Sequence, residues 1–196
     1  YVLVGTSASP LRKALIDCLG KAGDDSAVAE LVVALTDPMR NVREAAILAL
    51  VAIHSRYPDV VARQLSQSEK GPAAVAVSGY LDDEYAEPLK RATVRILGWL
   101  GDSDSVLPLL KMLDYESLQQ EALAALVDIG RGHCQALLST WSKVEGNQRA
   151  YLAYILGEAG CSEGLSVLQD GLRSDDNQLV RMSAYALGKI GAVQMM

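Results

Sequence analysis

The sequence has few of the residues that build metal sites and disulfide frameworks. Its 196 residues include three cysteines and two histidines. Zinc sites and disulfide frameworks need cysteines at paired spacings, and Cys18, Cys134 and Cys161 are too isolated to provide them. We therefore expect no metal, no cofactor and no disulfide, and a reducing, cytoplasmic location.

Positive charge and long apolar runs are also scarce. Lys and Arg number 18 against 24 Asp and Glu, which gives a formal net charge of -6 at pH 7. Nucleic-acid binding relies on clustered basic residues that displace counterions, so we expect neither DNA nor RNA as a partner. No apolar run reaches the roughly 20 residues that a membrane-spanning helix requires, so no membrane segment is predicted.

The sequence does contain a repeated five-residue signature. It reads Leu-Gly-Lys-Ile-Gly at residues 187–191, and related copies begin at five other leucines. The leading leucines are Leu19, Leu50, Leu97, Leu126, Leu156 and Leu187, with steps of 31, 47, 29, 30 and 31 residues. A period near 30 residues indicates stacked repeats, each of which buries its apolar face against its neighbours. The expected fold is an all-α, right-handed α-α superhelix of about five to six two-helix repeats.

The residues before each leading leucine have the period of an amphipathic helix. With the leucine as position zero and about 100 degrees per residue, positions -8, -4, -3, -1 and +3 share its face. In the last repeat these positions hold Leu179, Ser183, Ala184, Ala186 and Ile190. We predict a buried face of small side chains that favours close helix packing, and a left-handed glycine at +4 that ends the helix. Residues 26–35, 105–113 and 163–172 are predicted to form outer helices.

The spacing is irregular between the second and third signatures. We place the extra residues at 64–83, with a loop at 66–72 and a short extra helix at 73–81. Insertions of this kind usually decorate one edge of a solenoid. Residues 1–196 are otherwise expected to form a single solenoid. Because residues 1–4 resemble the end of a helix and 193–196 the start of another, we expect a fragment of a longer array.

Two stretches resemble a known family. They are Asp37-Pro38 followed by Val42-Arg43 and Ala46, and Asp175-Asp176 followed by Val180-Arg181 and Ala184. With their closing signatures they resemble HEAT-like repeats of the phycobilin-lyase type, an armadillo-like α-solenoid. The resemblance implies that the turn aspartate and the inner-helix arginine hydrogen-bond along the stack, Asp37 with Arg43 and Asp175 with Arg181.

No group of residues predicts catalysis. His54 replaces the last glycine of a signature. We interpret it as a polar residue at a helix end, not as a ligand or a base. His133 and Cys134 are adjacent, so on a helix they diverge by about 100 degrees and do not form a catalytic pair. Cys18 falls on the predicted buried face, whereas Cys161 lies in a turn and is the one thiol expected to be exposed.

Positions -2, -5, -6 and +2 point away from the buried face and, in this kind of repeat, line the concave side. Aromatic residues at these positions gather toward the C-terminal repeats. The predicted partner-binding strip comprises Arg95, Trp99, Tyr151, Tyr154, Glu158, Arg181, Met182 and Tyr185. Aromatic residues, Met and Arg are enriched at interface hot spots. We therefore predict a non-enzymatic scaffold that binds a protein or peptide on its concave face.

Three alternatives stay open. The tyrosines could pack against a further repeat or fill the inner curve of the stack. Together with an arginine they could cradle an open-chain tetrapyrrole, which would make the chain a subunit or accessory of a bilin lyase or isomerase. The chain could also be a regulatory module fused to a catalytic domain outside it.

Overall fold

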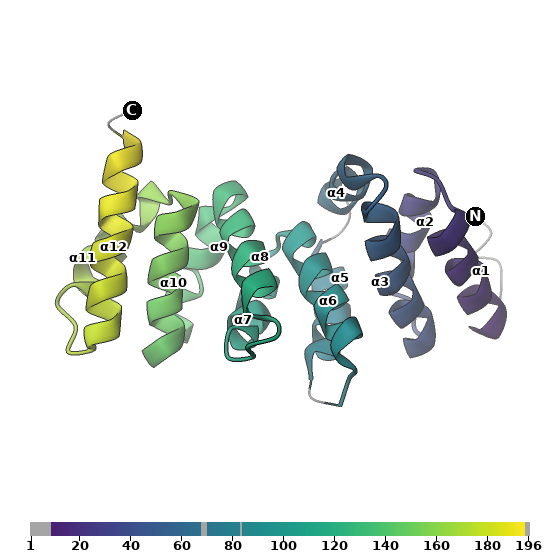
Figure 1. The fold of residues 1–196 in the computed structure, drawn as a ribbon, viewed down its shortest axis with the longest axis horizontal. Coiled ribbons are helices and arrows are strands. Elements are labelled where there is room, and N and C mark those ends of the chain that lie inside the picture. The colour runs from purple at the N-terminus through teal and green to yellow at the C-terminus, as the bar shows by residue number, and fades with distance from the viewer. Residues whose placement is uncertain (1–8, 68–69, 83, 195–196) are drawn as a thin grey trace. The chain divides into compact units, whose positions relative to one another are not determined.

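The computed structural model describes residues 9–67, 70–82 and 84–194, and every regular element in these ranges is a helix. The predicted all-α fold is thus confirmed. Contacts within the chain define two compact units, Tyr1–Leu100 and Gly101–Met196, called unit 1 and unit 2 below. Figure 1 shows the helices of both units. No helix in the described ranges is long and apolar enough to cross a membrane.

Unit 1 consists of an inner and an outer layer of helices. The inner helices α1, α3 and α6 pack in sequence, and α2, α4 and α5 pack against them (Figure 1). The elements are α1 Ser9–Ala22, α2 Ala27–Ala34, α3 Arg40–His54, α4 Pro58–Gln67, α5 Lys70–Ser78, the 3-10 helix η1 Gly79–Leu81, and α6 Glu87–Leu100.

Unit 2 repeats the two-layer plan. Its inner helices α8, α10 and α12 pack in sequence, and α7, α9 and α11 form the outer layer. The elements are α7 Ser103–Met112, α8 Gln119–Gly132, α9 Cys134–Leu138, η2 Trp141–Lys143, α10 Gly146–Ala159, η3 Ser162–Gly164, α11 Leu165–Gly171 and α12 Asn177–Gln194. The three predicted outer helices correspond to α2, α7 and η3 with α11.

Each signature leucine lies on an inner helix, as the repeat predicts. The four in α3, α6, α8 and α10 are fully buried. Leu187 in α12 is half-buried and Ala184 is exposed, so the predicted buried face is too wide there. The packing partners of α12 are α10 and α11, which leave one side of the helix uncovered.

Signature glycines serve helix termination at some positions and helix packing at others. Gly101 and Gly160 have φ of 63° and 72° and end their helices as predicted. Gly130 and Gly191, at the same +4 position, lie inside α8 and α12 instead. At +1, a Cβ on Gly157 would lie 2.5 Å from the Ala186 Cα. Glycine at +1 therefore lets α10 and α12 approach closely.

The insertion is part of the core of unit 1, not a decoration at its edge. Helix α5 already begins at Lys70, within the predicted loop, and residues 68–69 and 83 lie outside the described residues. Val77 and Tyr80 are buried against the neighbouring helices. The insertion thus supplies apolar side chains to the layer that covers α6.

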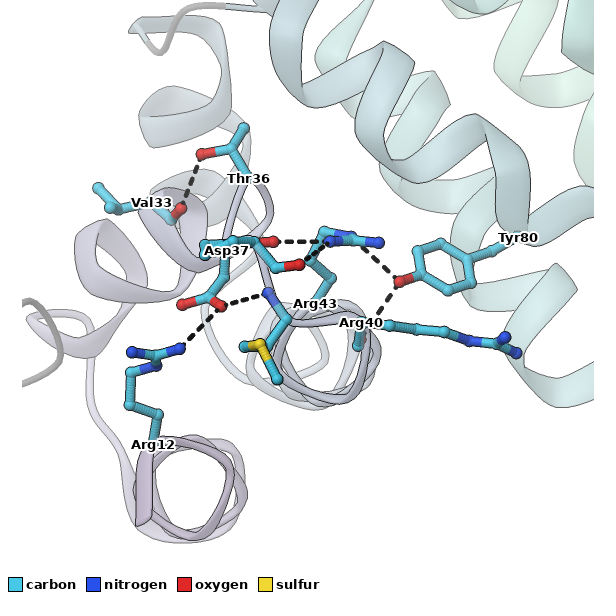
Figure 2. A network of polar contacts seen from close by, with 9 residues as sticks. Arg12, Val33, Thr36, Asp37, Arg40, Arg43 and Tyr80 are labelled. Carbon is cyan, nitrogen blue, oxygen red and sulfur yellow. Dashed lines mark hydrogen bonds and ion pairs between the residues drawn. The ribbon is translucent and has the colours of Figure 1, made fainter. Parts of the chain in front are cut away.

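Tyr80 also joins the insertion to α3 through hydrogen bonds. Its hydroxyl accepts from Arg43 Nε at 3.1 Å and donates to the Arg40 carbonyl at 3.2 Å. The Arg43 Nη1 donates to the carbonyl oxygen of Asp37 at 2.7 Å (Figure 2). The Asp37 carboxylate instead accepts from Arg12 of α1 at 3.2 Å and from the Met39 amide at 2.8 Å.

The predicted aspartate–arginine contacts therefore need correction. Asp37 and Arg43 do bond, but through the Asp37 carbonyl, and Arg12 is the residue that binds the carboxylate. In the last repeat Asp176, not Asp175, accepts the Gln178 and Leu179 amides at the start of α12. Arg181 lies six residues before its signature leucine, whereas Arg43 lies seven before Leu50, and this shift of one residue accompanies an exposed Arg181.

The predicted helix ends at the chain termini are only partly described. Residues 1–4 lie outside the described residues. Residues 193–194 continue α12 and do not begin another helix.

Candidate protein-binding surfaces

Two tyrosines stack on one side of α10 and α12. The ring centroids of Tyr154 and Tyr185 are 5.3 Å apart, and their planes differ by 15°. Each tyrosine stands two residues before its signature leucine, so the close approach at Gly157 brings equivalent positions together. Stacking of this kind contributes roughly 0.5–1.5 kcal/mol beyond burial. The pair is a fixed aromatic surface on which Tyr185 remains 41% exposed.

Glu158 and Lys189 hold the exposed ring in place. The Tyr185 hydroxyl donates to Glu158 Oε1 at 2.5 Å, and Lys189 Nζ lies 3.2 Å from the same oxygen. The hydrogen bond from Tyr185, followed by the Lys189 contact, lowers the pKa of Glu158. Hydrogen bonding to Glu158 raises the pKa of Tyr185 and of Lys189. At neutral pH the two charges offset each other, and the surface is aromatic with no net charge.

We call Tyr154, Tyr185, Glu158 and Lys189 the tyrosine ladder. Three of the four belong to the predicted strip, and the structure does bring them together. Sequence analysis missed Lys189. The signal for it was its position four residues after Tyr185, which places the two side chains on the same helix face.

The other strip residues of unit 2 are placed differently. Tyr151 is half-buried, and its hydroxyl accepts from Gln119 Nε2 of α8 at 3.4 Å. Met182 is half-buried on α12. Arg181 is exposed, and no hydrogen bond or ion pair among the described residues joins it to the ladder. Tyr151 therefore joins α10 to α8.

In unit 1, Trp99 is engaged within the chain while Arg95 is not. The Trp99 ring stacks on His54, with centroids 3.9 Å apart and planes at 14°. Burial, and then the Arg95 charge, lower the pKa of His54. Arg95 itself is exposed and has no ion pair within the described part of the chain.

Arg95 lines a cleft of about 510 Å³ on α3 and α6. It is lined by Leu48 and Val51 from α3 and by Glu87, Pro88, Arg91, Ala92 and Arg95 from α6. Sequence analysis missed this cleft. Leu48 stands at the same -2 position as Arg95, Tyr154 and Tyr185, and that equivalence was the available signal.

The cysteines have the opposite exposure from the one predicted. Cys161 is 3% exposed, and its Sγ lies 3.5 Å from the Gly130 carbonyl oxygen. Cys18 is exposed. Burial raises the pKa of Cys161 and of its neighbour Cys134, which keeps both thiols protonated and poorly nucleophilic. Across the described ranges, no three or more His, Cys, Asp or Glu residues are grouped so as to hold a metal ion.

Comparison with known proteins places this arrangement among repeat proteins. Residues 2–77 match the family model for HEAT repeats. A designed armadillo repeat protein matches with a TM-score of 0.50 over 96% of this chain and 97% of that chain, at 15% sequence identity. The fold is an armadillo- and HEAT-type solenoid. No match was found among curated proteins. The phycobilin-lyase subtype of repeat stays a prediction.

Proposed function

We propose that this solenoid is a non-enzymatic scaffold that binds another protein through the tyrosine ladder of α10 and α12. Solenoids offer extended surfaces made of equivalent positions from successive repeats, a form suited to protein binding. The observation that carries the proposal is the Tyr154–Tyr185 stack, which leaves a large aromatic side chain exposed at 41%. Tyrosine is among the residues most enriched at interface hot spots.

The geometry of the ladder lowers the cost of binding. A side chain that becomes immobile on association loses roughly 0.5–1.5 kcal/mol of rotamer freedom. Tyr185 is already held by Tyr154, Glu158 and Lys189, so most of that freedom is lost in the free protein. A partner can therefore gain the area of the ring at little further cost in entropy.

Site-specific crosslinking tests this function. Tyr185 is replaced by p-benzoylphenylalanine, and the protein is irradiated in lysate of its source cells. Tyr115, 38% exposed on the turn between α7 and α8, takes the same replacement as a matched control. We expect a discrete crosslinked protein from position 185 and not from position 115. Equal crosslinking from both positions, or none from either, would contradict the proposal.

A second arm links capture to the aromatic rings. Tyr154→Ala with Tyr185→Ala should remove the captured protein, whereas Tyr185→Phe should retain most of it because the ring remains. Truncation of a hot-spot residue costs at least about 2 kcal/mol, or roughly 30-fold in affinity. Circular dichroism of both variants checks that the helices persist. A visible bilin spectrum in the captured fraction would favour the lyase alternative instead.

A further inference from the structure

The cleft in unit 1 has an apolar wall that a soluble partner could cover. Leu48 is 49% exposed although it lies on an inner helix. Val51 follows it on α3, and Pro88 and Ala92 face it from α6. A volume of about 510 Å³ falls within the range of ligand-binding clefts, about 300–1,000 Å³. The space suits a few side chains of a bound segment.

The charge of the cleft is opposite to that of the whole chain. Two guanidinium groups, of Arg91 and Arg95, line it together with one carboxylate, of Glu87. Arg91 binds Glu87 at 2.9 Å, which leaves the Arg95 charge uncompensated. Glu44, one turn before Leu48 on α3, is paired with Arg40 at 2.8 Å. A positive site thus exists in a chain of net charge -6.

We propose that this cleft binds a short acidic and apolar segment of a partner protein. An apolar side chain of the segment packs on Leu48, Val51 and Pro88, and a neighbouring carboxylate binds the Arg95 guanidinium. Arginine recognises carboxylates through paired N–H donors in a fixed plane, which sets the orientation of the segment as well as its charge. A basic segment is disfavoured by Arg95.

The inference rests on the proposed function as a protein-binding scaffold, but it concerns a separate surface. The tyrosine ladder lies in unit 2 and has balanced charges, so it has no reason to select acidic segments. The two surfaces can therefore be tested independently, and either can fail alone.

A selection from a displayed library of random 12-residue peptides tests the chemistry of the cleft. We expect the wild-type chain to enrich peptides that carry Asp or Glu within about one helical turn of Leu, Ile, Val or Met. The enriched peptides, labelled with fluorescein, then give dissociation constants by anisotropy. Enrichment of basic peptides, or no enrichment at all, overturns the proposal.

Matched substitutions locate the binding. Arg95→Glu should weaken the selected peptides about 10-fold or more, because it replaces attraction by repulsion. Arg173→Glu, a charge reversal at an exposed arginine of unit 2, is the control and should leave affinity unchanged. Leu48→Asp should likewise remove binding, while Val75→Asp on the exposed side of α5 should not. Equal losses in a variant and its control overturn the assignment to the cleft.

The tyrosine variants separate the two proposals. Peptides whose affinity falls in Arg95→Glu and persists in Tyr154→Ala with Tyr185→Ala support the cleft. Peptides whose affinity falls only in the tyrosine variants overturn the proposal for the cleft and indicate the tyrosine ladder as their binding surface. If the chain with the crosslinker at position 185 captures no protein while peptide binding persists, the proposal for the tyrosine ladder is overturned and the proposal for the cleft stands.

Discussion

The inner-helix pairs α10–α12 and α3–α6 differ at two equivalent positions. At +1 and -1 around the signature leucines, α10 has Gly157 and α12 has Ala186, whereas α3 has Val51 and α6 has Ile96. Small residues let α10 and α12 approach until the tyrosines at -2 stack. Larger residues accompany an open cleft between Leu48 and Arg95, also at -2. One repeat frame thus yields either a closed aromatic ladder or an open cationic cleft.

The helix pairs α10–α12 and α3–α6 differ at their surfaces, whereas the core beneath the cleft of α3 and α6 is fully packed. Leu97 and Ile96 of α6 are fully buried, and the insertion covers the helix from its outer side. The same repeat that departs from the 30-residue spacing contains the open cleft. The cleft therefore lies in the irregular repeat, whereas the tyrosine ladder lies in repeats of regular spacing.

The largest effect is expected from truncation of a core leucine below the cleft. Leu97→Ala should lower the free energy of unfolding by about 2–5 kcal/mol, because it opens a cavity in a fully packed site. Leu187→Ala should cost less, since one side of Leu187 is already open to solvent. Urea denaturation measures both. An equal loss in the two variants would contradict the difference in enclosure.

The close approach of α10 and α12 can be tested at two equivalent glycines. Gly157→Ala places a Cβ 2.5 Å from the Ala186 Cα, and overpacking of this kind costs about 1–3 kcal/mol. Gly188→Ala, at the same +1 position of α12, meets no atom within 4 Å. It should raise stability by about 0.5–1 kcal/mol through helix propensity. Thermal midpoints that move in the same direction would argue against close packing at Gly157.

A double-mutant cycle compares the two -2 positions directly. Alanine substitutions at Tyr154 and Tyr185 should show a coupling energy of about 0.5–1.5 kcal/mol, because the rings stack. The same cycle at Leu48 and Arg95 should give a coupling near zero, since the cleft separates them. Similar couplings at both pairs would mean that the cleft is closed in solution.

The smallest effect is a dependence of stability on pH that differs between the units. Burial lowers the pKa of folded His54 below its ordinary 6.5, so the unfolded chain binds the proton more tightly. The contribution of neutral His54 to the free energy of unfolding is complete above pH 6.5 and is lost as pH falls through the folded pKa. Glu158 in unit 2 loses its contribution only below its ordinary 4.5, as pH falls through its lowered pKa.

Variants and titrations separate these two windows. His54→Gln should remove the decline in thermal midpoint that begins near pH 6.5, and Glu158→Gln should affect the acid window alone. An NMR titration of His54 provides the direct measurement. A His54 pKa at or above 6.5 in the folded chain would disprove the assigned burial.

Helical repeats were predictable from the sequence because the helical period is local. The six leading leucines locate the six inner helices. Asp102 caps α7 by accepting the Asp104 amide, whereas Asp24 accepts the Ser26 amide in the turn before α2. Exposure was predictable for Tyr185 and Arg95, which lie opposite the buried face. The predicted exposure of Cys161 was wrong, because its side chain is buried against Gly130, which lies about 30 positions earlier in the sequence.

Sequence alone determined the inner helices, their repeat and the face that α3, α6, α8 and α10 bury, since these follow from periodicity and composition along a single segment. Tertiary structure decided which equivalent side chains meet. Whether the residues at -2 stack or leave a cleft depends on how closely two inner helices approach. Gly157 and Ala186 let α10 and α12 approach closely, whereas α3 and α6 have the larger Val51 and Ile96 at these positions. These residues lie about a repeat or more apart, and their packing is fixed only when the helices are assembled.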